Sequence, residues 1–215
     1  MKRLPLFLSL SSVLLSVLLS STPVFAAGPV LIIGDERVQG RFGELLEQKL
    51  REKDGTASSR ISACGLTVLD WLQGSKTNCG YFEKKLTGEV TQSKEAQVAP
   101  LITYVSDTKP EFLIFIHGNR GLDTGVKALQ AQIELVGRLL TANKTGCLWM
   151  GPGEEVSARV SDPYYSAIRE AATRAGCAVI DAPLFSALLE QRRSLSELEP
   201  LAEVVVEMIS VGRDL

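Results

Sequence analysis

Short apolar segments alternate with amphipathic ones along this chain, and this alternation constrains its fold more than any other feature of the sequence. Phe112–Ile116 is a run of five apolar residues, as expected of a strand that is covered on both faces. Strands that alternate with helices pair in parallel through right-handed crossovers. The sequence therefore predicts an α/β fold, a three-layer α/β/α sandwich around a parallel sheet of about five strands. The predicted strands cover residues 30–34, 58–64, 111–118, 146–151 and 177–182, and the predicted helices cover residues 42–53, 124–141, 163–175 and 198–210.

Two segments carry further local signals. Residues 74–108 are long, polar and interrupted by glycines, so we predict an irregular excursion that is held in place by Cys79. Later in the chain, Asp162 followed by Pro163 is typical of a helix start, and Gly176 is typical of a helix end. We therefore expect the third helix to begin at Pro163.

The first 27 residues form a segment of a different kind. Lys2 and Arg3 precede an apolar run of about 17 residues, and small residues around Ala26 and Ala27 follow it. A positive start, an apolar middle and a small-residue cleavage site are typical of a secretory signal peptide. We expect a signal peptide at 1–27 and a single domain at 28–215, periplasmic or secreted, with no membrane span after cleavage. An uncleaved anchor is the alternative.

The balance of charge argues against nucleic acid as a partner. Without Lys2 and Arg3 the chain has 21 Lys and Arg residues against 25 Asp and Glu residues, a net charge of −4. It contains no basic run and no patch in which aromatic and basic residues alternate, which nucleic-acid binding would require. A neutral or cationic ligand suits an exported protein of this charge better.

Four cysteines follow the leader: Cys64, Cys79, Cys147 and Cys177. An even number in an exported chain predicts two disulfides, with three possible pairings. Nearness in sequence favours Cys64–Cys79 and Cys147–Cys177. A zinc site would need closer cysteine spacing or neighbouring histidines, and the chain has only one histidine. We therefore expect no metal and no other cofactor.

Three short motifs follow predicted strands, at the sheet edge where α/β proteins place their sites. They are Gly34-Asp35-Glu36 with Gly40, Gly65 after the second strand, and Asn119 in IHGNRG. Together they resemble the SGNH (GDSL) hydrolase family, whose first block is G-D-S-x-x-x-G and whose next blocks carry a glycine and an asparagine. The cysteine-bearing segments are similar to those of an exported bacterial branch. The resemblance covers about residues 30–181 and implies a flavodoxin-like SGNH hydrolase fold.

The family's mechanism shows what this chain keeps and what it lacks. A serine attacks an ester carbonyl with the help of an Asp-oriented histidine, and hydrogen-bond donors hold the oxyanion. The resemblance implies that Gly65 and Asn119 are oxyanion-hole positions. Glu36, however, stands where the family has its serine, and the segment 181–200, where Asp-x-x-His is expected, contains no histidine. Nucleophile and base are both missing, and a glutamate would repel a forming oxyanion.

We therefore predict a degenerate, non-catalytic member that binds a carbohydrate or an acylated cell-envelope ligand such as a peptidoglycan fragment. Glu36 would then contact the ligand or be an inert remnant. The alternative is an active esterase or deacetylase on envelope glycans, in which His117 activates water, Glu36 orients it and Asp123 assists. A third hypothesis is a structural partner protein whose cleft is closed.

Three other side chains are candidates for contact with a sugar or for a structural role. Trp71 and Trp149 could each stack on a sugar ring. Trp149 lies inside an apolar run and is expected in the core, whereas the sequence leaves Trp71 open. Asp35 is expected to cap the turn that follows the first strand.

Overall fold

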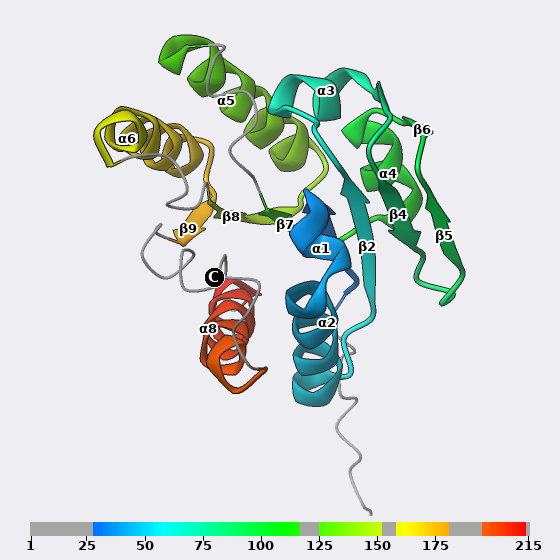
Figure 1. Ribbon diagram of the computed structural model, residues 1–215. Helices are drawn as coiled ribbons and strands as arrows, with labels where there is room; N and C mark the ends of the chain where they lie inside the picture. Colours follow the sequence, from blue (N-terminus) through cyan, green and yellow to red (C-terminus); the bar gives the residue numbers. More distant parts are fainter. Residues whose placement is uncertain (1–27, 117–124, 152–157, 181–194, 214–215) are drawn as a thin grey trace, which may run out of the picture.

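A computed structural model describes residues 28–116, 125–151, 158–180 and 195–213 of the protein. Its main sheet has seven strands in the order β5-β4-β2-β1-β7-β8-β9 (Figure 1). Five neighbouring strands are parallel, as predicted. They are β1 (Val30–Gly34), β2 (Ser58–Ala63), β7 (Phe112–Ile116), β8 (Gly146–Met150) and β9 (Ala178–Ile180).

Helices cover both faces of this sheet and confirm the three-layer fold (Figure 1). Alternate residues of β1 point to opposite faces, so that Leu31 and Ile33 belong to one apolar cluster and Val30 and Ile32 to another. The first cluster lies under α3 (Val68–Gln73), α4 (Leu101–Thr108), α5 (Val126–Ala142) and α6 (Ala158–Arg174). The second lies under α2 (Arg41–Asp54) and α8 (Leu195–Arg213).

The segment 74–108 is regular, so the prediction of an irregular excursion was wrong. It contains β3 (Ser75–Thr77), β4 (Tyr81–Lys84), β5 (Val90–Ser93), β6 (Ala96–Val98) and α4. β4 and β5 extend the main sheet with antiparallel pairing, and β3 pairs with β6 in a separate ladder. β5 lies at the edge of the sheet and exposes three of its four residues, so it lacks the apolar run by which the parallel strands were recognised.

Helix boundaries were predicted less well than the helices themselves. α6 begins at Ala158, so the predicted start at Pro163 was wrong and Pro163 lies inside the helix. Its predicted end is confirmed, since the helix stops at Arg174 and Gly176 follows in the left-handed conformation, with φ 78°. α8 extends beyond the predicted 198–210 at both ends.

Both favoured disulfides are present. Cys64–Cys79 joins the end of β2 to the segment before β4, and its Cα atoms lie 5.5 Å apart. Cys147–Cys177 joins β8 to the residue before β9, with 4.7 Å between Cα atoms. The predicted signal peptide lies outside the described residues. Within those residues, every helix is too short or too polar to cross a bilayer.

Candidate functional site

The carboxyl ends of three neighbouring strands meet at one edge of the sheet. Gly34 at the end of β1 is paired with Ser62 on β2 and with Ile116 on β7. The chain segments that follow these strands therefore leave the sheet side by side. This brings the Asp35-Glu36 segment and the turn at Gly65 to the same edge, as predicted. His117, Asn119 and Asp123 lie outside the described residues, and their roles stay predictions.

Gly34 lets β1 and β7 approach closely at this edge. Its φ is 155°, and a Cβ atom placed on it would lie 2.0 Å from the carbonyl oxygen of Ile116. The next residue continues the pairing, because the Asp35 N–H donates to that same oxygen at 3.3 Å. A side chain at position 34 would push the two strands apart where the site begins.

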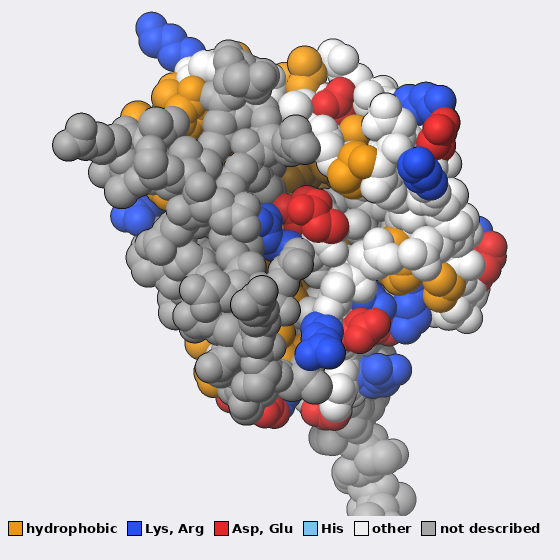
Figure 2. All heavy atoms as spheres, viewed as in Figure 1, with side chains coloured by type: hydrophobic (Ala, Val, Ile, Leu, Met, Phe, Trp, Pro, Cys, Tyr) orange, Lys and Arg blue, Asp and Glu red, His pale blue; other side chains and the backbone are white. Residues whose placement is uncertain are grey.

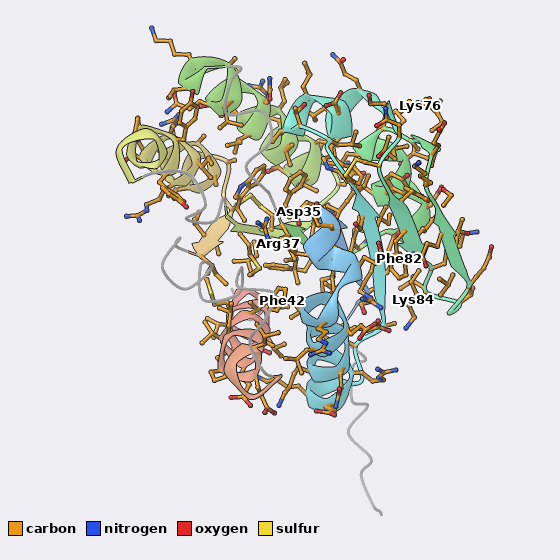
Figure 3. The ribbon with its side chains drawn as sticks, viewed as in Figure 1. Asp35, Arg37, Phe42, Lys76, Phe82 and Lys84 are labelled. Carbon is orange, nitrogen blue, oxygen red and sulfur yellow. A yellow bond between two sulfur atoms is a disulfide. The ribbon has the colours of Figure 1, made fainter. Side chains whose placement is uncertain are left out.

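Asp35 caps the short helix α1 (Glu36–Gln39), as predicted. Its carboxylate accepts a hydrogen bond from the Arg37 backbone N–H at 3.0 Å and also forms an ion pair with the Arg37 side chain (Figure 3). Both side chains are largely buried. Burial is the main cause that raises the pKa of Asp35 to about 6; the neighbouring Glu36 charge contributes to the rise, and the charge and hydrogen bonds of Arg37 oppose it.

The raised pKa predicts a pH-dependent stability. Between the ordinary Asp value of 3.8 and about 6, the folded protein holds a proton that the unfolded chain releases. The free energy of unfolding should therefore fall as pH rises across this window, by up to about 3 kcal/mol. Asp35→Asn should lack this dependence, because asparagine still caps a helix but does not titrate. Urea unfolding of both proteins at pH 4 and pH 7 measures it, and an equal pH response in both would contradict the assignment.

Glu36 is the first residue of α1 and is exposed. Its carboxylate makes no hydrogen bond or ion pair with any residue in the described ranges. Figure 2 shows acidic and basic side chains next to each other over α1, where Asp35 and Arg37 form their ion pair. The Glu36 carboxylate is thus open to a ligand and is not neutralised by a described cation.

Gly65 offers a backbone donor at the same edge. It is exposed, in the turn after β2 with φ 78°, and its N–H has no hydrogen-bond acceptor among the described residues. The preceding residue is held firmly, because the Cys64 N–H donates to Gly80 at 2.9 Å and its carbonyl accepts from Thr77 Oγ1 at 2.8 Å. The Cys64–Cys79 disulfide adds a covalent tie. This N–H is therefore a fixed donor.

The sequence prediction missed Arg60, a residue of β2 that holds α1 in place through a hydrogen bond. Arg60 is buried on β2, and its Nη1 donates to the Val38 carbonyl of α1 at 3.1 Å. Its Nε lies 2.9 Å from a carboxylate oxygen of Glu47 on α2. The signal was present in the sequence, since Arg60 is the only charged residue of the strand segment 58–64.

The glycine that the structure needs near the first motif is Gly43 rather than Gly40. Gly40 has φ −73°, and a Cβ atom there would meet nothing closer than 3.7 Å. A Cβ atom on Gly43 would lie 1.9 Å from the Val38 carbonyl oxygen. Gly43 therefore allows α2 to pack closely against the end of α1.

Both tryptophans belong to the core. Trp149 stacks on Phe115 with 4.4 Å between ring centroids, as expected. Trp71 is only 2% exposed and packs edge-on against Tyr104 and Phe115, so it offers no surface for a sugar ring. The described residues also contain no cluster of three His, Cys, Asp or Glu side chains that could hold a metal ion.

Comparison with known proteins places this fold. No protein-family model matches the sequence, and no curated protein matches it. An α/β hydrolase from the metagenome of Lake Arreo, Spain, is 15% identical with a TM-score of 0.56, covering 86% of this chain and 96% of that one. An acetylxylan esterase from Geobacillus stearothermophilus is 13% identical with a TM-score of 0.53, covering 85% and 95%.

A peptidoglycan O-acetylesterase is 10% identical with a TM-score of 0.54, covering 88% of this chain and 92% of that one. At such low identity the likeness concerns the fold, and it extends over nearly the whole of each hydrolase. This chain therefore has the hydrolase-type α/β sandwich fold that these three enzymes share.

Proposed function

We propose that this protein is an exported, degenerate member of the SGNH (GDSL) hydrolase family that binds a carbohydrate or acylated cell-envelope ligand without hydrolysing it. One observation carries the proposal: Glu36, at the strand end where the family has its serine, is an exposed carboxylate with no described partner. The shared fold supports it, because two of the similar structures are an acetylxylan esterase and a peptidoglycan O-acetylesterase.

The residues at this edge do not suit ester hydrolysis. A carboxylate at position 36 carries a negative charge where an oxyanion would form, which opposes the charge that the reaction develops. The adjacent Asp35 carboxyl already caps α1 and pairs with Arg37, so it is not free to orient a base. The segment 181–200, where the family has its histidine, contains none.

The same residues suit binding. The Glu36 carboxylate can accept hydrogen bonds from sugar hydroxyls or from an ammonium group. The Gly65 N–H can donate to a carbonyl oxygen, such as that of an acetyl group. A glycan that carries acyl groups presents both partners. Two disulfides and the leader sequence support export, because disulfides persist in oxidising compartments.

Calorimetric titration with acetylated xylo-oligosaccharides and with peptidoglycan fragments tests the proposal. We expect the wild type to bind one of them, and Glu36→Gln to weaken that binding about tenfold, as for loss of one charged hydrogen bond. Glu52→Gln is the matched control, because Glu52 is exposed near the far end of α2. Absence of binding to every fragment would instead favour a structural partner protein.

An active esterase is the second candidate function. β1 and β7 are adjacent, with Gly34 opposite Ile116, so His117 follows the strand next to the one that presents Glu36. In this mechanism His117 activates water, and Glu36 orients the histidine. Hydrolysis that requires both side chains would identify this mechanism.

A further inference from the structure

A buried charge cluster beneath α2 carries more positive than negative charge. Glu47 on α2 is a single carboxylate shared by two cations, Arg60 on β2 and Lys84 on β4. Glu47 and Arg60 are buried, and the Lys84 side chain is 26% exposed. Neither cation pairs with another carboxylate among the described residues. The cluster therefore has an excess of one positive charge.

The other contacts of Arg60 do not remove this excess. Its guanidinium lies 5.2 Å from the centroid of the Phe82 ring and donates to the Val38 carbonyl, and both of these partners are neutral. Phe82 and Lys84 both come from β4 (Figure 3). An unbalanced charge in a poorly solvated place is unfavourable unless a counter-charge can reach it.

A cavity gives a counter-charge access to the cluster. It has a volume of about 310 Å³ and lies between the end of α2, the start of β2 and the connection from β4 to β5. The cavity therefore lies where β2 begins, whereas the candidate site lies where the parallel strands end. Four charged residues line it: Glu47, Arg51, Lys84 and Lys85. The lining therefore carries three positive charges against one negative charge.

The two remaining cations of the lining are available to a ligand. Arg51 is exposed and has no ion-pair partner among the described residues. Lys85 pairs with Glu89 at 3.0 Å, but both side chains are about half exposed, and such a surface pair stabilises little. Two carbonyl groups at the end of α2 are already hydrogen-bonded and so do not repel an anion as free carbonyls would. The Leu50 carbonyl accepts from the Thr56 N–H, and the Arg51 carbonyl accepts from the Gly55 N–H.

We propose that this cavity binds a small oxyanion, a phosphate group or a carboxylate, held by Lys84, Arg51 and Lys85. The anion would balance the cluster in which Glu47 is shared. The phosphate or carboxylate could be a free ion or a group carried by a larger molecule, and the chemistry of recognition is the same for both. The site is independent of the function proposed for the opposite edge of the sheet.

Thermal unfolding in increasing inorganic phosphate, with ionic strength held constant by sodium chloride, tests the proposal. The wild-type Tm should rise by about 4 °C when phosphate reaches ten times its dissociation constant. Lys84→Met and Arg51→Gln should each lose most of that rise. Lys76→Met is the matched control, since Lys76 is an exposed lysine that pairs with Glu95 on another part of the surface (Figure 3).

A second measurement separates anion binding from a purely structural role of the lysine. Without phosphate, Lys84→Met should be as stable as the wild type or more so, because Glu47 and Arg60 then form a balanced pair. Glu47→Gln should lower the Tm, because it leaves two cations unpaired. Glycerol phosphate in place of inorganic phosphate distinguishes the two sources of the anion. A larger rise in Tm with glycerol phosphate indicates a phosphate group carried by a larger molecule, and a smaller rise indicates a free phosphate ion.

Two results would overturn the proposal. One is a wild-type Tm that responds to phosphate no more than to chloride at the same ionic strength. The other is a phosphate response that Lys84→Met and Arg51→Gln retain in full.

Discussion

Gly34→Ala should lower the free energy of unfolding by at least about 3 kcal/mol. The added Cβ atom would lie 2.0 Å from the Ile116 carbonyl oxygen, and both atoms belong to neighbouring strands in the middle of the sheet. Relief requires that β1 and β7 separate, which weakens the backbone hydrogen bonds that place the candidate site. Urea unfolding followed by circular dichroism measures the loss.

Gly40→Ala is the internal control for that prediction. Gly40 belongs to the same motif, but its φ of −73° suits any residue, and a Cβ atom there would have 3.7 Å to its nearest neighbours. We expect a change of less than about 0.5 kcal/mol. If Gly40→Ala destabilised the protein as much as Gly34→Ala, the close approach of β1 and β7 would not be the cause.

Reduction of both disulfides should lower the free energy of unfolding by about 6.6 kcal/mol, which is comparable with the whole stability of many domains. Cys147–Cys177 closes a separation of 30 residues and Cys64–Cys79 one of 15, so the first should contribute about 3.6 kcal/mol and the second about 3 kcal/mol. Each bridge stabilises the protein by restricting the unfolded chain.

Paired Cys→Ala variants separate the two contributions. Removal of Cys64–Cys79 should also change the surroundings of Gly65, because the Cys79 sulfur packs against this glycine. A Cβ atom placed on Gly65 would lie only 3.3 Å from Cys79 Sγ. Amide exchange at residue 64, whose N–H donates to the Gly80 carbonyl, should speed up in that variant and stay unchanged when Cys147–Cys177 is removed. Denaturation curves that do not shift in reductant would contradict the prediction.

The parallel strands could be predicted because their signal is local. β1 and β7 are buried along their whole length, so an unbroken apolar run marks each of them in the sequence. β4 and β5 owe their place to antiparallel pairing with β2 and with each other. Such pairing leaves little trace in a polar edge strand, and the sequence prediction therefore missed both.

The candidate site was predictable only in part, for a similar reason. Asp35 caps a helix that begins at the very next residue, so its role follows from local order. Arg60 could be buried only because Glu47, 13 positions earlier and on another element, supplies a carboxylate at 2.9 Å. Trp71 is enclosed by Tyr104 and Phe115, both distant in the sequence. These contacts depend on the assembled fold.

An assay for hydrolysis of acetyl esters by the purified protein tests most directly whether the protein hydrolyses its ligand or only binds it. Acetylated xylo-oligosaccharides and an acetyl-ester dye are suitable substrates. We expect release of acetate at the rate of buffer alone, equal in wild type, Glu36→Ala and His117→Ala. Turnover by the wild type that disappears in both variants would contradict the non-catalytic function and establish a Glu36/His117 esterase.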